Sequence, residues 1–318
     1  MQKSKPLLSI CIPTYNRAKL LEKSLKSIIH QNRFDEIEVV ISDNCSTDRT
    51  KQIAEKYASI YENIKYYRNN KNIKDENFPK VLKLATGYLR KLSNDKIIYV
   101  DGAIEKILIL IENSISTKPS IYFLNGSRKT NRNCEVCKSV DEFMRKVSFM
   151  ITNIGLAALW DEDCQEDSIC LSTMKNHFES YLGQVPCIIE SIKRHKTVMI
   201  QNEYLMTSLN VERKDLSYGL YQVFYKNYMG FIKQYQNERL ISDYTCRYLR
   251  KDILLNFFSV WTASLDVNKD LYIVNDENLR ELIKEEYKNE KYYYIYWLKM
   301  HGNILKYKLL RVYRKLKN

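Results

Sequence analysis

The sequence lacks an apolar run long enough to cross a membrane as a helix. Its longest candidates, such as residues 107–111, fall far short of the roughly 20 residues that a crossing helix needs. Residues 1–6 have neither the apolar core nor the small-residue cleavage site of a signal peptide. We therefore expect the protein to stay in the cytoplasm.

Regularly spaced cysteines are also absent. The eight cysteines among 318 residues show no regular spacing, which is typical of reduced thiols in the cytosol rather than of a disulfide framework. Cys134 and Cys137 form a C-x-x-C pair, but no second pair of cysteines or histidines follows at the spacing of a zinc site. We interpret this pair as chance spacing.

Acidic residues are the scarcer charged class. The chain has 38 Asp and Glu against 51 Lys and Arg, a formal net charge of +13. Such a charge favours anionic partners, which include nucleic acid, phosphate-bearing ligands and acidic membrane surfaces. The sequence has no helix-turn-helix, zinc-finger or RNA-binding signature. A basic nucleic-acid-binding protein is therefore the weaker alternative, and we expect no nucleic-acid partner.

The first third of the chain alternates strand and helix patterns. Between apolar runs, residues such as Leu21, Leu25 and Ile28 recur at helical spacing. The apolar runs predict strands buried on both faces, at residues 7–12, 37–42, 64–67 and 88–92. This alternation predicts an α/β fold with a mostly parallel, doubly wound sheet.

After about residue 127 the pattern weakens. Residues 130–138 are polar and lack periodicity, so they predict a loop. Residues 150–159 predict a strand, and residues 185–192 predict a helix before a strand at 197–200. From residue 211 onward the pattern is mostly helical and rich in tyrosine.

Three polar clusters follow predicted strands: residues 13–17, residues 43–44 and residues 93–95. In an open parallel sheet, ligands bind beyond the carboxyl ends of the strands. Each cluster alone would be explained by turn chemistry, because Pro, Asn, Asp and Ser are common in turns. Their coincidence at three strand ends indicates a binding site.

Two of these clusters belong to segments that resemble the N-terminal signature of family 2 glycosyltransferases of the GT-A type. The segments are SICIPTYNR at residues 9–17 and VVISDNCSTD at 39–48. Asn77 followed by ATGY at 85–88 is similar to the stretch that leads to the acidic motif of that family. The resemblance covers about residues 7–112.

The resemblance implies a GT-A fold, with a Rossmann-like sheet flanked by helices. We expect a glycosyltransferase domain over residues 1–210, with a donor half at about 1–125 and an acceptor half at about 126–210. A mainly helical extension with a basic terminal helix would follow over residues 211–318.

The resemblance also implies a nucleotide-sugar donor, typically a UDP-sugar. Thr14 and Tyr15 would line the base and ribose pocket, and Asp43 would accept a hydrogen bond from the base, although an Asx-turn is its alternative role. Arg17 would steer the diphosphate or be a solvated charge at a helix start. The expected donor-binding residues are Pro13, Thr14, Tyr15, Asn16, Arg17, Asp43, Asn44, Asn94 and Asp95.

The acidic motif of the family departs from its usual pattern here. An Asp-x-Asp normally holds a divalent cation, Mg²⁺ or Mn²⁺, which neutralises the leaving diphosphate. In this chain Asp95 fits the first carboxylate, whereas Ile97 stands where the second is expected. Asp95 would bind the metal with donor phosphates and water, or Lys96 would supply part of the charge. Loss of catalysis, leaving a GT-A scaffold protein, is the third alternative.

An inverting displacement also needs a carboxylate that takes the proton from the attacking hydroxyl. The Glu-Asp pair of the family is not evident, because residues 182–184, Leu-Gly-Gln, stand at that place. Glu179 is the expected catalytic base, with His177 and Glu190 as alternatives. A carboxylate without function at a helix start is the competing interpretation of Glu179.

The C-terminal residues 299–318 contain seven Lys or Arg and no acidic residue. Apolar residues that include Leu305, Leu309 and Val312 fall on one helical stripe, which predicts a basic amphipathic helix. Such a helix binds an anionic membrane surface, or packs on the domain with a solvated basic face. Together with the resemblance, this predicts transfer of the sugar to a surface glycan such as capsule or lipopolysaccharide. The acceptor would be lipid-linked and would lie at the inner face of the plasma membrane.

Overall fold

The computed structural model describes residues 5–127, 132–209, 214–216, 218–274 and 278–317. The chain forms two compact units, Met1–Phe143 with Asn153–Asn210, and Met144–Thr152 with Val211–Asn318. The expected boundary at residues 210 and 211 lies outside the described residues, as do residues 130 and 131 of the predicted loop. The short segment Met144–Thr152 had no signal in the sequence that would assign it to the C-terminal unit.

A mixed sheet forms the centre of the first unit. Over the described residues it has eight strands in the order β3-β2-β1-β4-β8-β6-β9-β7. The strands β3, β2, β1 and β4 are parallel, and β8 runs antiparallel to both β4 and β6. The strands span Leu8–Thr14 (β1), Ile37–Asp43 (β2), Ile64–Arg68 (β3), Leu89–Leu92 (β4), Ser120–Phe123 (β6), Cys134–Cys137 (β7), Ala157–Trp160 (β8) and Val198–Gln201 (β9).

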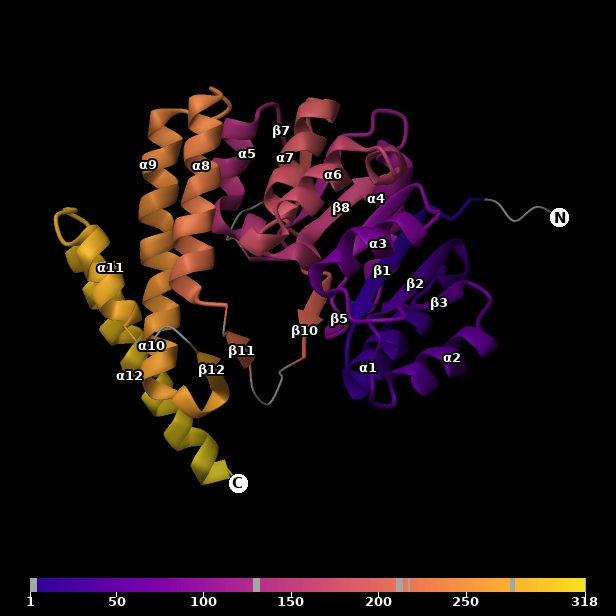
Figure 1. Ribbon diagram of the computed structural model, residues 1–318, viewed down its shortest axis with the longest axis horizontal. Helices are drawn as coiled ribbons and strands as arrows, with labels where there is room; N and C mark the ends of the chain where they lie inside the picture. The colour runs from indigo at the N-terminus through magenta and orange to yellow at the C-terminus, as the bar shows by residue number, and fades with distance from the viewer. Residues whose placement is uncertain (1–4, 128–131, 210–213, 217, 275–277, 318) are drawn as a thin grey trace. The chain divides into compact units, whose positions relative to one another are not determined.

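Helices cover both faces of this sheet. Because side chains alternate along a strand, Ile10 and Ile12 pack with one apolar cluster while Cys11 packs with another. The first cluster includes residues of α1 (Ala18–Ile29), α2 (Thr50–Ile60) and α4 (Ala103–Ser114). The second includes residues of α3 (Asn77–Leu84), α6 (Ile169–Asn176) and α7 (Gln184–His195). Figure 1 shows α1 and α2 below the parallel strands and α3 above them. The predicted α/β fold with a mostly parallel sheet is confirmed.

Two predictions of local structure were wrong. Within the predicted loop at residues 130–138, Cys134–Cys137 form the edge strand β7, which pairs antiparallel with β9. Within the predicted strand at 150–159, only Ala157–Trp160 is extended, after short 3₁₀ turns at Ser148–Thr152 and Ile154–Leu156. In both cases backbone pairing decides the structure, and pairing with a distant strand leaves little local signature.

The C-x-x-C pair is not a metal site. On a strand, residues three positions apart point to opposite faces, and Cys134 is exposed whereas Cys137 is buried. Among the described residues, no group of three or more His, Cys, Asp or Glu could hold a metal ion.

The second unit is mainly helical. Its helices are α8 (Tyr228–Asn237), α9 (Asp243–Asp252), α10 (Ser259–Val267), α11 (Leu279–Tyr287) and α12 (Tyr293–Lys317), and α5 (Val140–Val147) connects the two units in sequence. In Figure 1, α8 and α9 lie side by side. Two short parallel strands, β11 (Lys214–Leu216) and β12 (Tyr272–Val274), complete it.

Aromatic contacts explain part of the tyrosine content of this unit. The rings of Phe224 and Phe257 have centroids 4.6 Å apart, and those of Tyr225 and Tyr287 are 5.5 Å apart. Such edge and tilted contacts stabilise helix packing beyond burial alone. In the part of the chain that the structure covers, no helix is both long and apolar enough to cross a membrane.

Candidate active site

A cavity of about 340 Å³ lies in the first unit. It opens where the carboxyl ends of β1, β2 and β4 meet the loop after β3, which is the edge of a parallel sheet at which ligands bind. Its lining residues are Pro13, Thr14, Tyr15, Arg17, Asn44, Asn72, Lys74, Asp75, Asn77, Phe78, Leu92, Ser93, Asn94, Asp95, Ile154 and Gly155. Seven of the nine donor-binding residues expected from the sequence are therefore brought together here, all except Asn16 and Asp43.

Asp95 is the most buried carboxylate on the cavity wall. It is 2% exposed, and its Oδ2 accepts a hydrogen bond from Thr14 Oγ1 at 2.9 Å. Its Oδ1 lies 3.1 Å from Arg17 Nη1 in an ion pair. Burial raises the pKa of Asp95, and the charge of Arg17 together with both hydrogen bonds opposes that rise. The ends of β1 and β4 are thus joined by a partly exposed cation and a buried anion.

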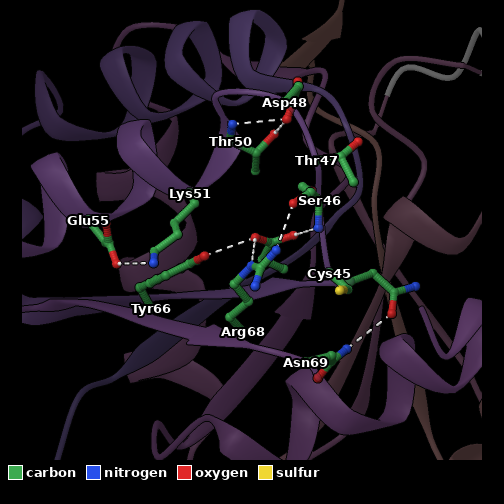
Figure 2. A network of polar contacts seen from close by, with 12 residues as sticks. Cys45, Ser46, Thr47, Asp48, Thr50, Lys51, Glu55, Tyr66, Arg68 and Asn69 are labelled. Atoms are coloured by element: carbon green, nitrogen blue, oxygen red, sulfur yellow. Dashed lines mark hydrogen bonds and ion pairs between the residues drawn. The ribbon is translucent and has the colours of Figure 1, made fainter. Parts of the chain in front are cut away.

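Asp43 is fully buried and is not among the residues that line the cavity. Its Oδ1 accepts a hydrogen bond from Ser46 N at 2.8 Å, and its Oδ2 accepts one from Tyr66 Oη at 2.8 Å. Arg68 Nε lies 3.4 Å from the same Oδ2. In Figure 2 the dashed lines from Ser46, Tyr66 and Arg68 meet at this one carboxylate. Asp43 therefore stabilises the loop after β2, through a bond three residues on rather than the two of an Asx-turn, and its hydrogen bond to the base stays a prediction.

Asn16 connects two loops. Its backbone has φ 52°, in the left-handed region that asparagine tolerates better than most residues. Its Oδ1 accepts hydrogen bonds from Thr47 N at 2.7 Å and from Asp48 N at 3.4 Å, and its own N–H donates to Ser46 Oγ at 2.9 Å. Asn16 therefore connects the loop after β1 to the loop after β2.

The loop after β3 contributes wall residues that the sequence analysis missed. Asn44 Nδ2 donates to Asn72 Oδ1 at 2.7 Å and to the carbonyl oxygen of Lys74 at 3.2 Å, which fixes this loop against the end of β2. Asp75 is partly buried, and burial raises the pKa of its carboxyl while the charge of Lys74 opposes the rise. The sequence could have indicated these residues by their position, because this loop also follows a strand of the parallel part of the sheet.

The residues present do not fit the two-carboxylate cation site that GT-A glycosyltransferases commonly use. Asp95 is a single carboxylate, and both of its oxygens are already engaged by Thr14 and Arg17. Lys96 and Ile97 follow it, so neither supplies the second acidic ligand that a hard cation prefers. Asp95 as a metal ligand therefore stays a prediction that the side chains around it do not support.

The expected base candidates lie away from the cavity wall. Glu179 is exposed in the single turn Phe178–Ser180 that precedes α7. His177 Nδ1 lies 2.9 Å from the carbonyl oxygen of Thr173, and Glu190 pairs with Lys193 at 2.7 Å. None of these three side chains lines the cavity. The identity of the base stays a prediction.

Lys91 is a fully buried lysine directly behind the cavity. Its Nζ donates to the carbonyl oxygens of Leu92 at 3.1 Å and Gly155 at 2.6 Å, and both of these residues line the cavity. The ammonium lies 5.2 Å from the centre of the Phe123 ring. Burial lowers the pKa of Lys91 to about 7. The Lys91 side chain therefore joins two parts of the cavity wall, the end of β4 and residues 154–155.

Comparisons with known proteins agree with this geometry. Residues 9–132 match the model of glycosyl transferase family 2. The abequosyltransferase RfbV of Salmonella typhimurium is 37% identical over 120 residues, which cover 36% of this chain and 34% of that protein. A GalNAc(5)-diNAcBac-PP-undecaprenol beta-1,3-glucosyltransferase of Campylobacter jejuni is 42% identical over 64 residues, 20% of each chain. The matches thus span about a third or less of these relatives' length.

The fold is also found among solved structures. The crystal structure of S. aureus TarS 1-349 in complex with UDP-GlcNAc superposes with a TM-score of 0.54 and 17% sequence identity, covering 82% of this chain and 75% of that one. A second TarS 1-349 structure, in complex with UDP, has a TM-score of 0.54 over 97% of this chain and 91% of its own. At this identity the likeness concerns the fold alone. Residues 9–132 therefore match glycosyl transferase family 2, and the unit that contains them has the GT-A fold.

Proposed function

We propose that this protein is a glycosyltransferase that moves a sugar from a nucleotide-sugar, a UDP-sugar, to a surface-glycan acceptor. The observation that carries the proposal is the cavity at the strand ends of a family 2 domain, with Tyr15, Arg17 and Asp95 on its wall. In an inverting enzyme, the acceptor hydroxyl attacks the anomeric carbon directly, and the nucleoside diphosphate leaves as the new bond forms.

The chemistry of the wall suits such a donor. Tyr15 is 42% exposed, so its ring offers an apolar face to a base. The side chain of Arg17 is 45% exposed, so its guanidinium can meet an anion while it remains paired with Asp95. Guanidinium groups bind phosphate oxygens with several donors in a fixed plane.

Charge neutralisation of the leaving diphosphate would fall to Arg17 and Lys74. These are the two cationic side chains on the described cavity wall. Because Ile97 stands where the second carboxylate of the motif is expected, and both oxygens of Asp95 are engaged, no step of this proposal runs through a cation. Asp95 orients Arg17, and Thr14 in turn orients Asp95.

Two carboxylates are candidates for the base. Glu179 lies in the expected acceptor half, in the turn before α7. Asp75 lines the cavity, and burial shifts its pKa upward, toward the range in which a base is effective near neutral pH. The base would accept the proton of the attacking hydroxyl, so it must lie within hydrogen-bond reach of the bound acceptor.

The printed names of the relatives support a bacterial surface glycan as the acceptor class. One relative is an abequosyltransferase, and the name of another specifies a saccharide on PP-undecaprenol. We propose a lipid-linked glycan acceptor of the capsule or lipopolysaccharide kind, met by a cytoplasmic enzyme at the inner face of the plasma membrane. The basic helix α12 would bring the enzyme to that surface.

Thermal-shift measurements with UDP-, GDP-, dTDP- and CMP-sugars test the donor site. We expect a UDP-sugar to raise the melting temperature of the wild type and not that of Asp95→Ala. The exposed Asp101→Ala variant removes the same charge outside the cavity and should keep the shift. Repeating the series with EDTA, and then with added Mg²⁺, tests the cation. Stabilisation by none of the four sugars would refute the donor site, and stabilisation lost in EDTA but restored by Mg²⁺ would refute the role given to Arg17 and Lys74.

A catalytically impaired GT-A scaffold is the second candidate. It is favoured by Ile97 at the second metal position and by residues 182–184, which replace the Glu-Asp pair. A scaffold would bind the nucleotide-sugar without releasing UDP from it, with or without acceptor. Release of UDP that is lost in Asp95→Ala would exclude the scaffold.

A further inference from the structure

The long helix α12 has one face that packs on α10. Tyr296 and Met300 are buried on this face, and Tyr296 Oη donates to Thr262 Oγ1 at 3.2 Å. Asn303 Nδ2 donates to the carbonyl oxygen of Ser259 at 3.3 Å, and Arg311 Nη1 donates to that of Val267 at 2.8 Å. Figure 1 shows the helix running along α10. These contacts fix the rotation of α12 about its own axis.

The opposite face of α12 is apolar and exposed. At 3.6 residues per turn, the apolar positions that are more than half exposed fall within an arc of about 160°, centred away from α10. Each of these side chains is more than half exposed. They form the exposed stripe, which consists of Tyr294, Trp297, Leu298, Leu305, Leu309, Val312 and Tyr313. At its N-terminal end, an apolar hollow of about 330 Å³ is lined only by residues of the helix itself.

Positive charge borders the exposed stripe. Lys306 lies beyond one edge of the arc and Lys308 lies at the other, and both are exposed. From residue 291 to residue 318 the sequence has no Asp or Glu. A scattered exposed leucine needs no explanation, but a continuous stripe with lysines at its edges is the arrangement of a helix that lies in a membrane interface.

We propose that α12 docks on an anionic phospholipid surface through the exposed stripe. The apolar side chains would enter the boundary between headgroups and acyl chains, with Trp297 at headgroup depth. Lys306 and Lys308 would extend along the surface to anionic headgroups while their aliphatic stems stay against the apolar layer. The proposal rests on the proposed function, since docking would hold the enzyme on the membrane that carries a lipid-linked acceptor.

Charge decides between this surface and a second copy of the chain. Pairing two stripes would bring together two basic helix faces without an acidic residue to compensate them. An anionic leaflet supplies that compensation and attracts each nearby lysine. The membrane is therefore the occupant that fits both the apolar and the charged parts of this face.

Sedimentation of the full chain with vesicles tests the proposal. We expect binding to phosphatidylcholine vesicles that contain phosphatidylglycerol and much weaker binding to phosphatidylcholine alone. Lys306→Glu with Lys308→Glu should weaken binding about tenfold or more, and Leu305→Glu with Leu309→Glu should do the same. Lys23→Glu with Lys65→Glu makes the same charge change on exposed residues of the first unit and should have little effect.

Fluorescence supplies an independent readout. Trp297 should move to a less polar environment on binding, giving a blue shift that Trp297→Phe removes. Equal binding by all variants, or equal binding to neutral vesicles, would overturn the proposal. A dimer in light scattering that the leucine substitutions abolish, without vesicle binding, would show that a second copy covers the stripe instead. Thermal shifts with the UDP-sugar on the same variants separate the two proposals, because donor binding does not depend on the stripe.

Discussion

The guanidinium of Arg17 lies 3.1 Å from the buried carboxylate of Asp95, although 78 residues separate them in the chain. The pair joins the loop after β1 to the end of β4 on the wall of the cavity. The carboxylate has almost no exposure, whereas nearly half of the Arg17 side chain faces solvent. The cation of the pair is therefore the member that an anionic ligand can reach.

Arg17→Ala should weaken binding of UDP. Hydrogen bonds to charged groups contribute about 1.5–3 kcal/mol, so the dissociation constant should rise about tenfold to a hundredfold. Isothermal titration calorimetry measures this directly. Arg49→Ala removes the same charge from an exposed position next to α2 and should leave the constant unchanged. An equal effect of both variants would indicate that only net charge matters.

Asp43→Asn should lower the free energy of unfolding even without a ligand. The substitution removes a buried charge that accepts bonds from Ser46 and Tyr66 and pairs with Arg68, at a cost of about 2 kcal/mol. Tyr66→Phe removes one of these bonds and should cost about 1 kcal/mol. Urea denaturation measures both. Unchanged stability of Asp43→Asn, with UDP binding abolished, would instead assign Asp43 directly to the ligand.

Lys91 should make stability depend on pH. Burial lowers its pKa from 10.5 to about 7, so between these values the unfolded chain binds one more proton than the folded chain does. Stability therefore rises with pH across this window, and the cost of burying the charge is fully present below it. The free energy of unfolding of the wild type should gain about 2 kcal/mol more than that of Lys91→Met from pH 7 to pH 9. Urea denaturation of both proteins at each pH measures this difference. The same dependence of the free energy of unfolding on pH in both proteins would contradict the prediction. Lys65→Met, at an exposed position, is the control.

A pair of amide substitutions tests the base. If Glu179 or Asp75 takes the proton, Glu179→Gln or Asp75→Asn should lower kcat by about 10²–10⁴-fold with little change in donor affinity. Glu55→Gln, on α2, is the matched control, because this exposed carboxylate lies outside the cavity and is no candidate for the base. Loss of UDP affinity in Asp75→Asn with unchanged kcat would place that residue in donor binding. Full activity in both variants would exclude both carboxylates.

The sequence by itself determined the central strands of the first unit and the polar clusters that follow them. The runs at residues 7–12 and 37–42 are apolar at most positions, on both faces of the strand, so they could be identified as central strands without a partner. The polar residues of the expected site directly follow these strands in the sequence, so their place at the strand ends could also be predicted. This is why seven of the expected donor residues, Thr14, Arg17 and Asp95 among them, meet at one cavity.

Only the tertiary structure decided which of these side chains face the cavity and which serve the fold. Asn16 belongs to the same motif as Tyr15, and Asp43 to the same motif as Asn44. The oxygens of Asn16 and Asp43 are nevertheless taken up by Ser46, Tyr66 and Thr47. Cys134–Cys137 became a strand only because β9 offers it a pairing edge. Which side of α12 stays uncovered was likewise decided by its packing on α10. Local spacing specifies periodicity, but the choice between a ligand, a neighbour and solvent depends on residues far away in the chain.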